Sequence, residues 1–148
     1  MEENRLIYWA GFIDGKGTFK IIKRRPNRKT REKTPKYIPY LAVANTNEAI
    51  IKLLKKEFGC GTIWHKKPFK PNHKPAFAWY VCDRKCVEIV EKLYPYLIVK
   101  KPQAELILKF YNDVGQRMSF GPVCTPNHII EKREYYYNQM KILNKRGR

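Results

Sequence analysis

Two candidate β-hairpins, each followed by a candidate helix, constrain the fold of this 148-residue chain more than any other feature. β-branched, aromatic and basic residues partly alternate over residues 18–24 and 36–44, and the polar, basic segment 26–35 joins these two runs. Two more strand candidates, at 61–65 and 76–82, flank the basic and proline-rich segment 66–75. The chain therefore repeats the order strand, strand, helix, which predicts an α+β fold.

Helical periodicity places candidate helices around both hairpins. Residues 3–14 carry apolar side chains at helical spacing, and we expect the glycine-rich segment 15–17 to end this first helix. The polar residues 45–48 can cap a second helix that ends at Gly59, and Asp83 can cap a third that ends at Pro95. Further helices are expected over 101–113 and 127–143. The predicted order is αββαββα plus extra C-terminal helices, in a single domain spanning 1–148, with its core at about 4–116 and a C-terminal helix and basic tail at about 124–148.

The two hairpins can merge into one four-stranded antiparallel sheet with helices on one face and the other face open. In the first strand, Phe19 and Ile21 would point toward the helices, whereas Lys20 and Arg24 would point the opposite way. The same alternation, together with the basic loop of the first hairpin, assigns six residues to a nucleic-acid-binding surface: Lys20, Arg24, Arg28, Tyr40, Trp64 and Lys66. For each of them, the alternative is an ordinary solvated side chain.

The charge of the chain favours a polyanionic partner. The 31 Lys and Arg residues exceed the 13 Asp and Glu residues, and a formal net charge of +18 would be self-repulsive without such a partner. A membrane-surface protein would need a basic amphipathic helix or a lipidation signal, and the sequence has neither. The polar N-terminus and the lack of a long apolar run predict an intracellular protein, in a bacterial cytoplasm or an organelle, that is neither secreted nor membrane-bound.

Gly11 and Gly15 stand four residues apart on one side of the predicted first helix, next to Ala10. Because these positions have little or no side chain, a second helix could approach the backbone closely. The pattern predicts a helix pair with Ala10, Gly11 and Gly15 at its interface.

The segment that contains these residues, Trp9-Ala10-Gly11-Phe12-Ile13-Asp14-Gly15-Lys16-Gly17, resembles the signature of the LAGLIDADG homing endonucleases. The resemblance continues through 45–47 and 94–104, and it covers about residues 5–112. It implies a homing-endonuclease-like αββαββα fold whose antiparallel strands form a saddle in the DNA major groove. Because the signature occurs once, the resemblance implies a homodimer on a pseudo-palindromic double-stranded DNA target of roughly 20 base pairs, typically in an intron-bearing or intron-target gene.

The resemblance also implies Mg²⁺-dependent DNA cleavage, with an acidic side chain at position 16 and the backbone carbonyl of Gly15 as metal ligands. This chain has Lys16 at that position, and an ammonium group would repel the ion that hard oxygen ligands bind. We therefore expect cleavage that is impaired or absent.

The resemblance assigns supporting catalytic roles to two more residues. Asn47 would order water near the scissile phosphate, and Lys100 would stabilise the developing charge; the alternative for both is a solvent-exposed structural role. Asp14 would buttress the end of the signature helix, and Ile51 occupies a position that is basic in some relatives.

Three functions remain open at this point: a homing endonuclease of the intron-encoded type, active or disabled; a DNA-binding regulator that does not cleave; and an intron RNA maturase. The run Tyr135–Tyr137 in the last predicted helix could serve an RNA partner. An aromatic run on a helix more often packs against its own domain.

Overall fold

The computed structural model describes residues 1–27, 29, 32–116 and 125–145. Its elements follow the chain in the order α1 (Glu3–Lys16), β1 (Gly17–Arg24), β2 (Lys36–Asn45), α2 (Glu48–Phe58), β3 (Thr62–Lys66), β4 (Ala76–Cys82), α3 (Asp83–Leu93), a 3-10 turn (Tyr94–Tyr96), α4 (Lys101–Phe110), a π-helical turn (Tyr111–Gly115) and α5 (Asn127–Asn144). The predicted order αββαββα with additional C-terminal helices is confirmed.

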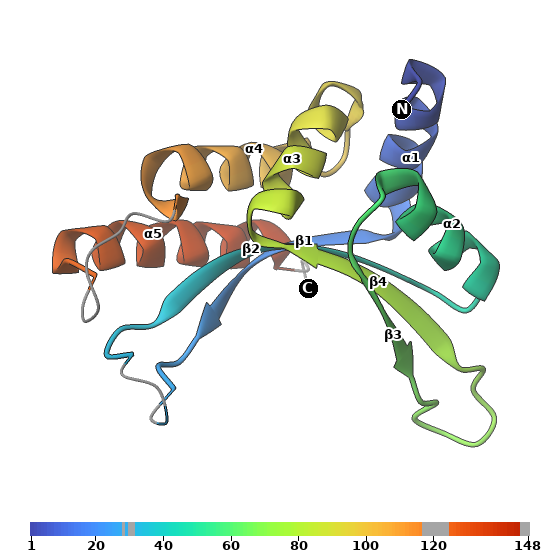
Figure 1. Cartoon of the computed structure of the whole chain (residues 1–148), viewed down its shortest axis with the longest axis horizontal. Helices are drawn as coiled ribbons and strands as arrows, with labels where there is room; N and C mark the ends of the chain where they lie inside the picture. Colours follow the sequence, from blue (N-terminus) through green and yellow to red (C-terminus); the bar gives the residue numbers. More distant parts are fainter. Residues whose placement is uncertain (28, 30–31, 117–124, 146–148) are drawn as a thin grey trace.

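The four strands form one antiparallel sheet in the order β1-β2-β4-β3. The helices α1 to α4 lie on one side of this sheet, and both hairpins extend from it on the other side (Figure 1). The sheet is strongly curved, so its helix-free face is concave and lies between the two hairpin tips (Figure 1). We call this helix-free side the open face.

The core lies between the sheet and the helices. Phe19 and Ile21 of β1 are buried on the helix side, as the alternation in the sequence predicts, and they face the same layer as Leu41 and Trp79. Burying such a side chain stabilises the fold by about 1.5–3 kcal/mol. The Trp79 indole N–H also donates a hydrogen bond to the Cys60 carbonyl at 2.9 Å, which ties β4 to the chain entering β3.

Three helix boundaries differ from the expected ones. Helix α1 continues through Gly15 and ends at Lys16, because the backbone becomes extended only at Gly17. Asp83 is the first residue of α3 and has a positive φ of 57°, and no side chain caps this helix, so the predicted Asp83 cap is wrong. Helix α4 ends at Phe110, where a π-helical turn replaces the predicted last α-helical turn.

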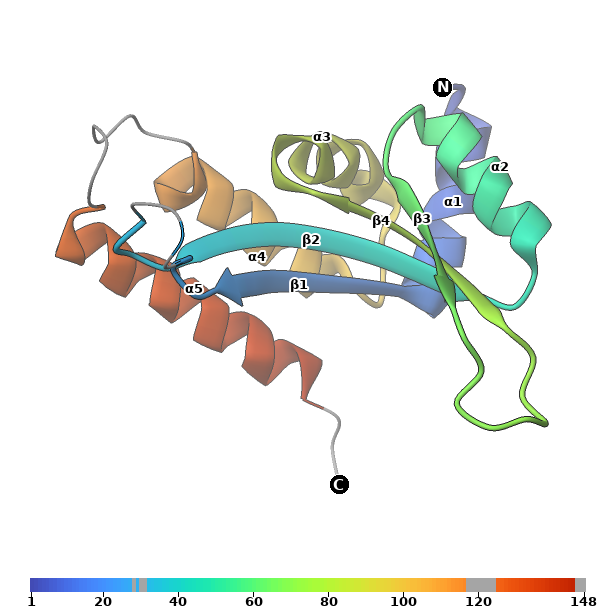
Figure 2. The ribbon, with the colours of Figure 1, turned by 60° about the horizontal axis from the view of Figure 1, so that its bottom comes forward.

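The C-terminal helix α5 runs beside the edge strand β1 (Figure 2). The Asn144 side-chain amide donates a hydrogen bond to the Phe19 carbonyl at 2.7 Å, and Glu134 accepts a hydrogen bond from the Tyr37 hydroxyl and forms an ion pair with Lys23 at 2.8 Å. The Asn144 bond occupies a backbone carbonyl of the edge strand, which would otherwise be open to another strand, and the Glu134 contacts hold the helix in place.

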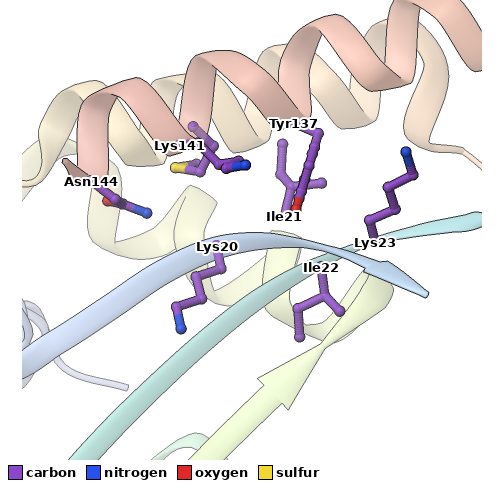
Figure 3. A pocket seen from close by; sticks show the side chains of 8 residues that line it. Lys20, Ile21, Ile22, Lys23, Tyr137, Lys141 and Asn144 are labelled. Carbon is purple, nitrogen blue, oxygen red and sulfur yellow. The ribbon is translucent and has the colours of Figure 1, made fainter. Parts of the chain in front are cut away.

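Helix α5 and β1 together enclose a shallow groove of about 390 Å³. Tyr137, Lys141 and Asn144 line it from the helix and Lys20 to Lys23 from the strand (Figure 3). The tyrosine run faces its own domain in part, because Tyr137 packs edge-to-face on Tyr37 and the Tyr136 hydroxyl bonds Asp113 at 2.9 Å. Among the described residues, no helix combines the length and the apolar character that crossing a membrane requires.

Candidate nucleic-acid interface

The register of the sheet determines which side chains share the open face, because directly paired residues point to the same side. Lys20 pairs with Tyr40, which pairs with Cys82 on its other side, and Trp64 pairs with Ala78. Five of the six residues predicted to bind nucleic acid therefore lie together on the open face: Lys20, Arg24, Tyr40, Trp64 and Lys66. The sixth, Arg28, lies outside the described residues.

The middle of the open face is aromatic and apolar. The rings of Tyr40 and Tyr80 stack across β2 and β4, with 5.8 Å between their centroids and 27° between their planes. Burial, with a smaller contribution from Tyr80, raises the pKa of the Tyr40 hydroxyl, so it remains a neutral hydrogen-bonding group at neutral pH. Tyr80 was not among the predicted residues, although its position between the buried Trp79 and Val81 gives the same alternation signal.

Basic side chains lie toward the ends of the same face. Trp64 is 59% exposed, and the Lys66 ammonium lies 6.0 Å from the centre of its ring. At the other end, Glu32 binds Lys36 at 2.6 Å and Arg24 at 3.7 Å. The hydrogen bond from Lys36 lowers the pKa of Glu32, so this acid is charged at neutral pH and partly offsets the positive charge at this end of the face.

The C-terminal end of α1 lies against the segment that precedes α4. The Asp14 carboxylate accepts hydrogen bonds from the backbone N–H groups of Ile98 at 2.7 Å, Val99 at 3.2 Å and Lys100 at 2.9 Å. The Lys100 ammonium in turn donates to the Asp14 carbonyl at 2.6 Å. The Asp14 side chain therefore fixes the segment that carries Lys100, which agrees with its expected buttressing role.

Lys16 is exposed in the last turn of α1. Its positive charge and that of Lys100 both lie at the helix C-terminus, where the partial negative charge of the helix dipole stabilises cations. The side chains present here do not suit a divalent ion, because Asp14 is already bonded to three N–H groups and Lys16 is cationic. Within the described parts of the chain, no cluster of three or more His, Cys, Asp or Glu side chains could hold a metal.

Asn47 has a clear structural role at the start of α2. Its side-chain oxygen accepts hydrogen bonds from the backbone N–H groups of Ala49 at 3.0 Å and Ile50 at 3.3 Å. Capping bonds of this kind typically contribute about 1 kcal/mol. Asn47 thus caps the helix as one of the predicted candidates, and its oxygen is already occupied.

One side of α1 is exposed, and two glycines leave part of it without side-chain bulk. Gly11 and Gly15 are both exposed, and a Cβ atom added at either would meet nothing within 4 Å. Ile7 and Tyr8 are also exposed on this helix. Ala10 differs, because it is 0% exposed and packs into the core of its own protomer, so it has no surface to offer a second copy and its predicted interface position is wrong.

Residues 9–112 match a family model described as LAGLIDADG endonuclease. The structure is similar to the homing endonuclease I-CvuI in complex with its target, with a TM-score of 0.76, 20% sequence identity and coverage of 98% of this chain and 85% of that chain. It is equally similar to the archaeal intron-encoded homing endonuclease I-Vdi141I complexed with DNA, with a TM-score of 0.76, 18% identity and coverage of 100% and 89%.

The meganuclease I-SmaMI bound to uncleavable DNA matches with a TM-score of 0.64 and 19% identity. The match covers 97% of this chain but 45% of that one, so this chain corresponds to less than half of the longer protein. No curated protein matches the sequence. The family model covers most of the chain and the fold is that of solved homing endonucleases, so this chain belongs to the LAGLIDADG endonuclease family.

Proposed function

We propose that this chain is a homodimeric protein that binds a specific double-stranded DNA sequence, as intron-encoded homing endonucleases do, and that Lys16 impairs its cleavage activity. The observation that carries the proposal is the open face, where Lys20, Arg24 and Lys66 lie around an aromatic centre that contains Tyr40. I-CvuI and I-Vdi141I, which share this fold, are seen in complex with DNA.

The open face has the properties that duplex DNA requires of a partner. The major groove admits a two-stranded β-ribbon, and two hairpins extend on the concave side of this sheet (Figure 1). Lysine and arginine side chains neutralise phosphates and release counterions. Exposed aromatic side chains such as Trp64 can contact base edges, which gives sequence preference that phosphate contacts lack.

The homodimer is inferred from α1. The exposed Gly11 and Gly15 leave a helix surface on which another helix backbone can lie closely, and a two-fold pair of this helix would use the same surface on both subunits. Two copies would then place two open faces side by side. A pseudo-palindromic target of roughly 20 base pairs, two half-sites of about one helical turn each, suits that symmetry.

Lys16 determines whether the dimer can hydrolyse the DNA phosphodiester bond. Hydrolysis in the family depends on a divalent ion, expected to be Mg²⁺, and the α1 terminus offers this ion the Gly15 carbonyl but no available carboxylate. Lys16 and Lys100 instead offer two ammonium groups, which bind phosphate as point charges. We therefore expect a tight complex in which the bound DNA stays uncleaved.

Gel-shift titrations at one fixed salt concentration test whether the partner is duplex DNA. The purified protein is titrated against a pool of random DNA duplexes and against structured RNA, alongside Lys20→Ala and the matched control Lys92→Ala, which changes an exposed lysine of α3 on the helix side. We expect duplex binding that Lys20→Ala weakens and Lys92→Ala preserves. Binding to RNA alone would refute the proposal in favour of a maturase.

A further inference from the structure

The β3–β4 connection, residues 67–75, carries a large apolar side chain that the fold does not use. Phe69 is 95% exposed, whereas Phe12, Phe19, Phe58, Phe77 and Phe110 are buried or half-buried. The connection forms the tip of its hairpin and extends on the side of the sheet that faces away from α1 to α4 (Figures 1 and 2). The segment that carries Phe69 therefore extends on the same side as the open face.

The tip is conformationally restricted before it meets a partner. Pro68 precedes Phe69, and Pro71 is the second residue of a turn closed by a hydrogen bond from the His73 N–H to the Lys70 carbonyl at 3.0 Å. Pro75 leads into β4. Prolines restrict the free chain, so less conformational entropy is lost when such a tip binds.

The charge around Phe69 fits a polyanion. Lys66, Lys67, Lys70 and Lys74 surround it in sequence, and the chain has no Asp or Glu between Gly59 and Asp83. An isolated exposed apolar residue needs no explanation by itself. Here, however, it belongs to the connection of a basic hairpin whose strand β3 carries Lys66 on the proposed DNA-binding face, so the lysines can bind phosphates while the exposed ring is free to contact bases.

We propose that Phe69 reads the C5-methyl group of a thymine in the major groove, at one fixed position in each half-site of the DNA target. This inference rests on the proposed function. A β-ribbon in the major groove directs its side chains at base edges, and the thymine methyl is the apolar group that those edges present. Insertion of an apolar wedge between bases is instead typical of minor-groove proteins.

Selection from a random duplex pool tests the assignment and identifies the target sequence at the same time. The wild-type protein, Phe69→Ala and Tyr135→Ala each select from the same pool, and the bound duplexes are sequenced. Tyr135 serves as the matched control because it is also an exposed aromatic residue but lies on α5. We expect symmetric positions at which the wild-type protein and Tyr135→Ala enrich thymine and Phe69→Ala does not.

Deoxyuridine substitution then removes the methyl group alone. Replacing the selected thymine with deoxyuridine should weaken wild-type binding about fourfold in one half-site and about fifteenfold in both, the effect of one buried methyl-sized group per half-site. The same substitution should leave the affinity of Phe69→Ala unchanged. The salt dependence of binding should stay the same in Phe69→Ala, because no phosphate contact is lost.

Two results would overturn the inference while the proposed function stands: identical sites and affinities for the wild-type protein and Phe69→Ala, or an equal deoxyuridine effect on both. A wild-type protein that enriches no duplex sequence at all would overturn the proposed function itself, and the role of Phe69 with it.

Discussion

Replacing Gly11 should stabilise the isolated protomer and destabilise the proposed dimer, and these opposite signs make the substitution informative. A Cβ atom at Gly11 meets nothing within 4 Å in the protomer, and Gly11 lies in the interior of α1. Alanine is favoured over glycine by about 1 kcal/mol in a helix interior. Gly11→Ala should therefore raise the free energy of unfolding of the protomer by about that amount.

In the dimer, the same methyl group would enter a close helix pair twice. Overpacking costs about 1–3 kcal/mol per site, so two sites cost about 2–6 kcal/mol and raise the dimer dissociation constant at least about thirtyfold. Sedimentation equilibrium measures this constant, and urea unfolding at protein concentrations below it measures protomer stability. Gly11→Leu is the stronger variant, and Ala49→Leu, at an exposed position of α2, is its matched control.

If Gly11→Leu dimerised as tightly as the control, Gly11 would not lie in a close helix pair. If Gly11→Ala instead lowered the unfolding free energy of the dilute protomer, the conclusion that its Cβ enters open space would be wrong.

Asp14→Ala removes three hydrogen bonds to a carboxylate, which water replaces in part, so it should lower the free energy of unfolding by about 2–4 kcal/mol. Calorimetry should show a melting temperature lower by roughly 5–15 °C, with Asp14→Asn between this variant and the wild-type protein. Burial, followed by the hydrogen bond to Glu134, raises the pKa of Tyr37 to about 12. The contribution of this shift to stability is therefore complete below pH ~10 and should be lost as pH rises through 12. Urea titrations should show that Tyr37→Phe lacks this loss. If Lys20 contacts one phosphate per subunit, Lys20→Ala should reduce the slope of log affinity against log salt by about 0.9 per subunit, measured by fluorescence anisotropy, whereas Lys92→Ala should leave it unchanged.

Periodicity predicted most of the fold because the spacing of apolar residues that indicates a helix or strand also determines which face packs into the core. The alternation in β1 that places Phe19 and Ile21 inside also places Lys20 outside, so the open face follows from the sequence once the strands pair in register. Helix ends were less predictable. Gly15 stays helical because a helix tolerates glycine at a cost of about 1 kcal/mol, and the turn into β1 comes two residues later, at Gly17.

The candidate site was less predictable than the fold, because its contacts join residues that are far apart in sequence. The Asp14 carboxylate reaches backbone N–H groups 84 to 86 residues away, and no local pattern encodes that pairing. Ala10 was assigned to a helix interface because it is small, but it lies on the side of α1 that packs into the core. Asn47 could be read as a cap or as a water-ordering residue, and the structure shows the capping bonds.

The central claim, that Lys16 separates DNA binding from DNA cleavage in this chain, is tested most directly by a cleavage assay on a selected duplex with Mg²⁺. The wild-type protein and Lys16→Glu are incubated with the same duplex, and bound and cut fractions are measured together, with Lys92→Glu as a control for the change in charge. We predict that all three bind and that Lys16→Glu alone cuts both strands. Efficient double-strand cleavage by the wild-type protein would contradict the account.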